Sequence, residues 1–287
     1  MKTFLDCLPC FLGQALGACR MATDDAAVHD RVLRRVLRRA SEFSFERSPP
    51  EMGADIHRII REETGDADPY RRAKARFNEF ALGLLPELRE RVAAASDPFA
   101  AAARMSIAGN VIDFALGADL EEEKVARTIE DALQHPLAVD HLELLRSAVD
   151  GASSILFLGD NTGEIVFDRL LLEQMPRERV TFVVRGAPVI NDATLEDAEA
   201  VGLTDLVEVV SNGSDVPGTL LEDCSADLQE RFRRADLVIS KGQGNYETLS
   251  GASREVFHLL KAKCPVIASD IGCGVGDMLV LRGHPSS

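Results

Sequence analysis

The stretch "SSILFLGDNTGEIVFD" (Ser153–Asp168) sets a polar corner between two apolar segments of different periodicity. Ser153–Gly159 is short and rich in β-forming residues, which predicts a buried strand, whereas Glu164–Met175 has the spacing of a helix. Four further β-rich runs follow, separated by helical segments. These runs are Arg179–Gly186, Leu206–Gly213, Asp236–Gly242 and Cys264–Asp270. Strands that alternate with helices predict an α/β fold with a mainly parallel sheet covered on both faces.

The first half of the chain has a helical pattern instead. Apolar residues recur every three or four positions in three long segments, residues 30–43, 69–95 and 101–120. Breaks in the helical pattern are expected at Phe45–Gly53 and at Ser96–Phe99, and a new helix is expected to begin near Pro98. No strand is expected before about residue 147. We therefore expect an all-helical part over residues 1–147 and an α/β part over residues 148–287.

Composition and charge narrow the class of protein. The chain has 287 residues, of which 46% are hydrophobic and 28% charged, as expected for a globular protein with a sizeable core. The formal net charge of −15 repels nucleic acid and anionic membranes, so neither is an expected partner, and the sequence indicates no obligate protein partner. No apolar run approaches the roughly 20 residues of a membrane span. Asp6, Pro9 and Gln14 interrupt the N-terminal apolar stretch, which favours an amphipathic helix and a cytoplasmic protein.

Polar residues follow the ends of the predicted strands. The four loops after successive strands read "GDNTGE", "RGAPVINDAT", "SNGSD" and "KGQGNYE". Ligands of open parallel sheets bind beyond the carboxyl ends of the strands, so these loops are expected to share one site. Each loop alone has an ordinary explanation, because Asp and Asn cap helices and glycines form turns. Four such loops at one edge favour a ligand site.

The chemistry of these residues suggests a metal ion and a phosphate. Asp160, Asn161 and Asp192 offer hard oxygen ligands of the kind that suit Mg²⁺ or Mn²⁺. Two carboxylates and an amide leave coordination positions for water and substrate, which is typical of a catalytic ion. Gly163 would let a phosphate approach a helix N-terminus, and Lys241 supplies a positive charge. The full candidate set for substrate or phosphate contact is Gly163, Glu164, Asn110, Asp113, Gly242 and Asn245.

Other motifs are weaker. Asn110 and Asp113 share one helix face, and their partners are either loop backbone or the metal site. Cys7 and Cys10 in "CLPC" resemble half of a zinc site without its second half, which favours core cysteines. All six cysteines are expected to be reduced. The loop "ASDIGCGVGDML" lacks the following helix and strand of a methyltransferase, and Thr162 replaces the second acid of an aspartyl-phosphate phosphatase.

Taken together, the motifs "GDNTGEIVFD", "RGAPVINDAT" and "KGQGNYETL", preceded by "AGNVIDF" and opened by "CLPCFLGQAL", resemble those of the metal-dependent damage-control phosphatases. This family was long catalogued as domain of unknown function 89. The resemblance extends from Cys7 to about Val280, with the motifs in the family's order, and the Cys-x-x-Cys is similar to that of the shorter bacterial and archaeal members. Cys273 and Asp277 in "GCGVGD" depart from the usual pattern.

The resemblance implies a helical N-terminal part packed on a Rossmann-like three-layer α/β/α domain, with the active site between them. It implies that Asp160, Asn161 and Asp192 bind the metal, that Lys241 lies at the phosphate site, and that Asn110 and Asp113 match the family's Asn-Asp helix pair. Members hydrolyse phosphorylated metabolites, often sugar phosphates or damaged cofactor fragments, with Mn²⁺, Co²⁺, Ni²⁺ or Mg²⁺.

The sequence therefore predicts a phosphomonoesterase in which metal-activated water attacks phosphorus. Asp160, Asp192 and Lys241 are the expected catalytic residues, and either Asp160 or Asp192 positions the water or the leaving group. One alternative is a non-catalytic Rossmann-like module that binds a phosphorylated metabolite. A second alternative is a metal-independent sugar-phosphate isomerase, which would convert its substrate without releasing phosphate.

Overall fold

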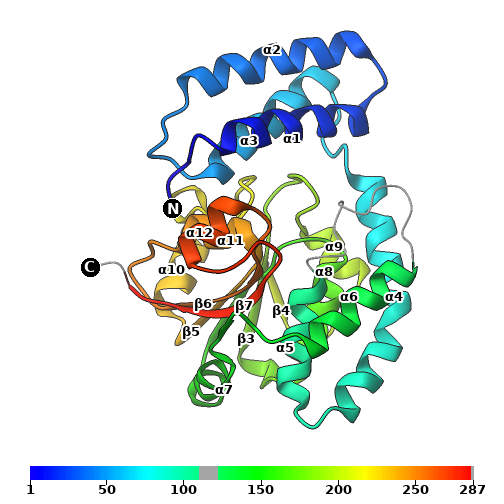
Figure 1. Ribbon diagram of the computed structural model, residues 1–287, viewed down its shortest axis with the longest axis vertical. Coiled ribbons are helices and arrows are strands. Elements are labelled where there is room, and N and C mark those ends of the chain that lie inside the picture. Colours follow the sequence, from blue (N-terminus) through cyan, green and yellow to red (C-terminus); the bar gives the residue numbers. More distant parts are fainter. Residues whose placement is uncertain (110–121, 286–287) are drawn as a thin grey trace.

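A central sheet organises the computed structural model, which describes residues 1–109 and 122–285 (Figure 1). Within the described residues the sheet has seven strands in the order β1-β7-β6-β5-β2-β3-β4. The strands are β1 Val139–Asp140, β2 Ile155–Leu158, β3 Val180–Val184, β4 Glu208–Ser211, β5 Leu237–Lys241, β6 Val256–Lys261 and β7 Met278–Gly283. Every neighbouring pair is parallel except β6 and β7, which are antiparallel. The expected mainly parallel α/β sheet is confirmed.

Helices cover both faces of this sheet. The helices are α1 Cys7–Ala22, α2 Ala26–Glu42, α3 Pro49–Thr64, α4 Arg71–Ala94, α5 Pro98–Gly109, α6 Glu122–Gln134, α7 Leu142–Gly151, α8 Glu164–Leu172, α9 Leu195–Ala200, α10 Ala226–Arg234, α11 Gly242–Leu249 and α12 Pro265–Ile271. Phe157 on one face of β2 packs in a core with α4, α5 and α8. Leu156 and Leu158, on the opposite face, pack with α10. Burial of both faces explains why β2 is apolar along its whole length.

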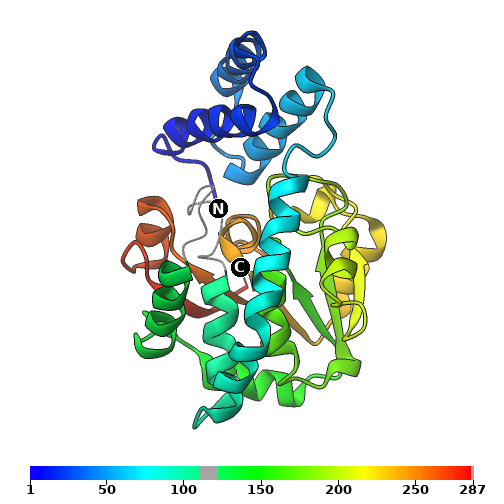
Figure 2. The same ribbon diagram turned by 90° about the vertical axis from the view of Figure 1, so that its right-hand side faces the viewer.

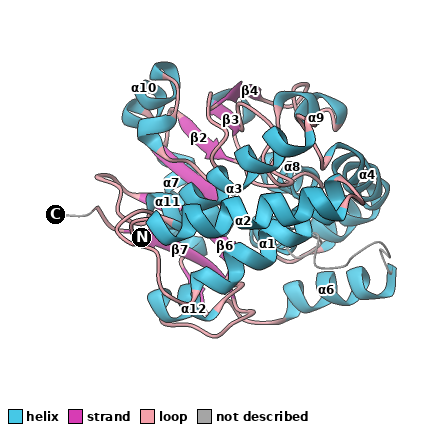
Figure 3. Ribbon diagram, turned by 90° about the horizontal axis from the view of Figure 1, so that it is seen from above, coloured by secondary structure: helices cyan, strands magenta, loops and turns pink. Residues whose placement is uncertain are grey.

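Helices α1, α2 and α3 form a separate group with its own core. Val32, Ile56 and Ile60 are among its fully buried residues. The group lies above the carboxyl ends of the sheet strands in Figures 1 and 2, and Figure 3 shows it from above. Arg58 and Arg61 of α3 form ion pairs with Asp215, in the loop after β4. These contacts fasten the helical group over the edge of the sheet where the predicted polar loops gather.

Helices α4 and α5 belong to the core of the sheet. Helix α5 packs on α8, where a side chain at Gly109 would clash with Phe167. Thus the helical first half contributes to two cores, one formed by α1–α3 and one shared with the sheet. The division of the chain at residues 147 and 148 stays a prediction. None of the described helices is both long and apolar enough to cross a membrane.

Several secondary-structure predictions were wrong. A strand was expected over residues 264–270, but helix α12 occupies Pro265–Ile271. Pro265 lies in its first turn, and Gly272 (φ 84°) ends it in the left-handed conformation. Strands β6 and β7 and the short β1 were missed. Helix α3 begins at Pro49, inside the expected break.

Candidate active site

The polar loops meet at the point where the strand order reverses. From β2 the chain adds β3 and β4 on one side, and it then crosses to add β5 and β6 on the other side. Such a switch point leaves a crevice at the carboxyl ends of the two central strands, and ligands of open α/β sheets bind there. Asp160 and Asn161 follow β2, and Gly242 follows β5.

Backbone hydrogen bonds join the loop after β2 to the loop after β3. Asn161 and Asp192 form an isolated antiparallel bridge. The Thr162 N–H donates to the carbonyl oxygen of Asn191 at 2.9 Å, and the Ala193 N–H donates to that of Asp160 at 2.8 Å. The structure thereby brings together the three residues predicted to hold a metal ion, Asp160, Asn161 and Asp192, all of them buried.

The Asn161 side chain is oriented by two carboxylates. Its Nδ2 donates to Asp160 Oδ2 at 2.9 Å and to Glu164 Oε2 at 3.1 Å. With the amide nitrogen used in this way, the amide oxygen Oδ1 is the atom available as a ligand for a cation. Glu164, the first residue of α8, is therefore part of this arrangement, and the substrate or phosphate contact predicted for it stays a prediction.

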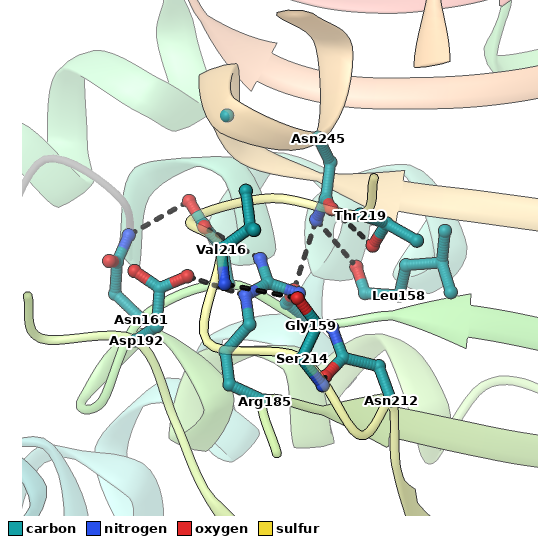
Figure 4. A network of polar contacts seen from close by, with 12 residues as sticks. Leu158, Gly159, Asn161, Arg185, Asp192, Asn212, Ser214, Val216, Thr219 and Asn245 are labelled. Carbon is teal, nitrogen blue, oxygen red and sulfur yellow. Dashed lines mark hydrogen bonds and ion pairs between the residues drawn. The ribbon is translucent and has the colours of Figure 1, made fainter. Parts of the chain in front are cut away.

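Arg185, at the end of β3, was missed by the sequence analysis. Its Nε donates to Asp192 Oδ2 at 2.6 Å (Figure 4). Its Nη2 lies 3.6 Å from Asp160 Oδ1. The side chain is only 1% exposed, and its Nη1 and Nη2 make no hydrogen bond within the described part of the chain. The arginine thus bridges both acids of the candidate metal site. The sequence signal that could have identified Arg185 is its place in "RGAPVINDAT", at the end of a strand and in the same loop as the expected metal ligand Asp192.

Lys241 lies behind the candidate metal ligands, in the interior. Its Nζ donates to Glu164 Oε1 at 2.7 Å, to Asp168 Oδ1 at 2.6 Å and to the Ser106 carbonyl oxygen at 2.9 Å. Burial opposes the charge of Lys241, but attraction to Asp168 and Glu164 outweighs burial and raises the pKa of the ammonium group. Burial also raises the pKa of Asp168 to about 6, although Lys241 counteracts the shift. Phosphate binding by Lys241 stays a prediction, since its donors here are used inside the protein.

These side chains form a buried ionic cluster with an excess of negative charge. Its members are the carboxylates Asp160, Glu164, Asp168 and Asp192 and the cations Arg185 and Lys241. Burial raises the pKa of Asp160 well above its usual range, and repulsion by Asp192 and Glu164 raises it further, while Arg185 opposes the shift. Among the described members of this cluster four carboxylates face two cations, and a divalent cation would balance this difference of two charges.

The donor set fits an ion that keeps open coordination positions. No three His, Cys, Asp or Glu side chains within residues 1–109 and 122–285 are arranged to hold a metal ion by themselves. The predicted set instead combines two carboxylates with one amide, so water and substrate oxygens would complete the coordination of Mg²⁺ or a similar hard ion. The excess negative charge of the buried ionic cluster and the hard oxygen donors both agree with a hard divalent ion at this site.

Gly242 lies directly against Asp160. Its φ is 77°, and a Cβ atom there would lie 1.8 Å from Asp160 Oδ2. Only glycine combines this left-handed backbone with so close an approach of a carboxylate. Gly242 therefore fixes the position of Asp160, a role distinct from the phosphate contact predicted for it, which stays a prediction.

The remaining predicted residues have other neighbours. The Gly163 N–H donates to Asn78 Oδ1 of α4 at 2.7 Å, so this N–H already has an acceptor. The Asn245 amide nitrogen donates to the carbonyl oxygens of Gly159 and Lys241, and its Oδ1 accepts from Thr219 (Figure 4). Asn245 thereby ties α11 to the end of β2, and phosphate contact by Gly163 or Asn245 stays a prediction. Asn110 and Asp113 lie outside the described residues.

A cleft of about 790 Å³ opens over Asp160, Asn161 and Asp192. One wall comes from α1 and α3, and the other from helix α11 and the loops after β2, β3, β4 and β6. The lining residues are Cys10, Phe11, Gly13, Gln14, Pro49, Pro50, Gly53, Asp160, Asn161, Ile190, Asn191, Asp192, Pro217, Gln243, Gly244, Glu247 and Lys263. Its volume lies within the range of small-molecule sites.

Two features of the lining bear on the sequence-based predictions. Ile190 has a φ of 46°, a strained conformation for a β-branched residue of the kind often found at functional sites. Cys10 is exposed to this cleft and Cys7 is half-buried, so the expected core position of Cys10 was wrong. All six cysteines are free thiols.

The fold and the site define an α/β protein with a small-molecule cleft at the switch point of its sheet. The chain belongs to the damage-control phosphatase ARMT1-like domain family, whose characteristic sequence it matches over residues 3–279. This confirms the resemblance that the sequence motifs suggested.

Relatives are similar over nearly their whole length. A damage-control phosphatase of Archaeoglobus fulgidus is 35% identical, covering 97% of this chain and 98% of the relative. A damage-control phosphatase of Pyrococcus horikoshii is 33% identical over 98% of both chains. An uncharacterised protein of Methanocaldococcus jannaschii is 35% identical over 96% of this chain and 94% of its own. The crystal structure of a DUF89 family protein from Pyrococcus horikoshii has a TM-score of 0.90 and 32% identity, with 99% of each chain covered.

Proposed function

We propose that the protein is a metal-dependent phosphatase that hydrolyses phosphomonoesters of small metabolites. The observation that carries the proposal is the convergence of Asp160, Asn161 and Asp192 at the floor of the cleft. Membership of the damage-control phosphatase family supports the reaction class. Sugar phosphates and damaged phosphometabolites are the proposed substrates, because a cleft of about 790 Å³ holds a molecule of that size.

Asp160, Asn161 and Asp192 are the proposed ligands of the metal ion, which is Mn²⁺, Mg²⁺, Co²⁺ or Ni²⁺. When bound, such an ion polarises a phosphoryl oxygen and lowers the pKa of water, which makes hydrolysis feasible at neutral pH. The chain contributes a preorganised set of ligands. Arg185 orients Asp192 through the 2.6 Å hydrogen bond from its Nε, and Gly242 leaves room for Asp160.

Lys241 supports the same ligands from inside the protein. Its hydrogen bond to Glu164 Oε1 leaves Glu164 Oε2 to accept from Asn161, so the lysine helps to orient the Asn161 amide. We propose that Asp160 and Asp192, whose side chains line the cleft, also position the attacking water or the leaving group. Helices α1 and α3 form the opposite wall, which shields the reacting phosphate from bulk water and selects the organic part of the substrate.

The test is metal-dependent release of inorganic phosphate. Protein stripped of metal is supplied with Mg²⁺, Mn²⁺, Co²⁺ or Ni²⁺, one at a time, and assayed on p-nitrophenyl phosphate and a panel of sugar phosphates. Asp160→Ala should abolish release, whereas the control Asp150→Ala, at an exposed position of α7, should retain it. Metal-independent release, or full activity of Asp160→Ala, would contradict the proposal. Binding of phosphorylated metabolites by folded protein, without turnover under any metal, would favour the non-catalytic alternative.

A further inference from the structure

Two lysines lie near the candidate metal ligands, and only one of them faces the cleft. Lys241 is fully buried, and its three acceptors are protein atoms. Lys263 is exposed and lines the cleft together with Asp160, Asn161 and Asp192. A phosphate ester that enters the cleft therefore meets Lys263, whereas Lys241 lies behind the carboxylates.

The fold holds Lys263 at the correct edge of the sheet. Strand β6 ends at Lys261, and Lys263 follows in the loop before α12, so it shares the carboxyl edge with the loops after β2 and β5. The Lys263 N–H donates to Gln243 Oε1 of α11 at 3.2 Å, which ties this loop to the cleft wall.

Charge balance in the cleft calls for a cation in addition to the metal ion. Among the described residues that line the cleft, Lys263 carries the only positive charge, while Asp160, Asp192 and Glu247 are acidic. A divalent ion would balance the excess charge of the buried ionic cluster and leave the ester itself uncompensated. A phosphomonoester carries a charge of about −1.5 to −2 at neutral pH. In a chain of net charge −15, that ester needs a local cation.

We propose that Lys263 binds the phosphoryl oxygens of the substrate and of the product phosphate, with its ammonium group donating to a non-bridging oxygen. Lysine serves such contacts as a compact positive charge on a flexible stem. The inference rests on the proposed phosphatase function. It assigns the two lysines different tasks, because Lys241 orients the metal ligands from inside and Lys263 contacts the phosphate from the cleft.

The test is the binding of inorganic phosphate, measured by isothermal titration calorimetry on Mn²⁺-loaded protein and by competitive inhibition of phosphatase activity. Lys263→Met should weaken phosphate binding by about 10-fold or more, the usual consequence of losing a hydrogen bond between charged groups. Affinity for Mn²⁺ should change much less. Lys263→Arg should restore most of the phosphate affinity, because it keeps the charge and the donors.

Lys261→Met is the matched control. Lys261 lies two residues away, but it lines a different cavity with Asp131 and Asp277. This variant removes the same charge at the end of β6, next to the loop that carries Lys263, and it should bind phosphate as the wild type does. Unchanged phosphate affinity in Lys263→Met, or equal weakening in both variants, would overturn the proposal. A wild-type protein that binds phosphate through Lys263 but releases none from any ester would refute the phosphatase function and leave this inference standing.

Discussion

Gly242→Ala is the substitution whose effect follows most directly from the structure. Real Cβ atoms essentially never approach a neighbour closer than 3.0 Å, yet the new Cβ would lie 1.8 Å from Asp160 Oδ2. The carboxylate must therefore withdraw by about 1.2 Å, the difference between these two distances. Displacement of a ligand by that distance should lower metal affinity at least as much as loss of a supporting contact does, about 10- to 100-fold.

Gly65→Ala separates this effect from backbone strain. Gly65 has a φ of 70°, against 77° at Gly242, but a Cβ atom at Gly65 would have open space for 4 Å around it. An alanine in this conformation costs about 1–2 kcal/mol at either position, which lowers Tm by several degrees. Mn²⁺ titration by calorimetry and thermal unfolding would be measured on both variants. Gly65→Ala should lose only stability, whereas Gly242→Ala should lose stability, Mn²⁺ affinity and phosphate release. Wild-type Mn²⁺ affinity in Gly242→Ala would refute the assignment of Asp160 as a ligand.

Three further predictions concern charged side chains. Lys241→Met leaves two buried carboxylates without their cation and should destabilise the fold by about 3–5 kcal/mol, measured by urea unfolding; a loss below about 1 kcal/mol would contradict the buried ion pairs. Glu247 has a pKa raised to about 7 by burial, so its favourable contribution to stability is complete below its ordinary pKa of 4.5 and is lost as pH rises through about 7. The free energy of unfolding of Glu247→Gln, relative to that of the wild type, should therefore be higher at pH 8 than at pH 4.5 by up to about 3 kcal/mol. An equal difference between the two proteins at both pH values would count against the raised pKa of Glu247. Arg185→Gln should weaken Mn²⁺ binding by about 10-fold through misorientation of Asp192, and unchanged affinity in calorimetry would show that this hydrogen bond does not orient the ligand.

Two of the strands that the sequence predicted correctly, β2 and β5, are buried on both faces. Residues 155–158 are apolar throughout, residues 237–239 are apolar as well, and polar residues or glycine follow each run. Residues 256–261 are equally buried, but they were not recognised as a strand. A short apolar run does not distinguish a strand from a buried helix, so Val266 and Ile267 suggested a strand where Pro265 in fact begins a helix.

The candidate site was predictable where it depends on topology alone. The carboxyl ends of parallel strands meet at one edge, so Asp160, Asn161 and Asp192 were expected to lie together. The directions of the Arg185 and Lys241 side chains depend on packing that no local pattern encodes. Lys241 points inward because α5 and α8 supply its three acceptors, and those helices meet only in the folded protein.

The most direct test of the central claim is the position of the metal ion itself. Crystals of the protein soaked in Mn²⁺ would be measured for anomalous diffraction at a wavelength where manganese scatters strongly. We predict an anomalous peak within ligand distance of the Asp160 and Asp192 carboxylates and of Asn161 Oδ1. A Mn²⁺ peak elsewhere in the protein, with none between these three side chains at saturating metal, would contradict the assignment of this site.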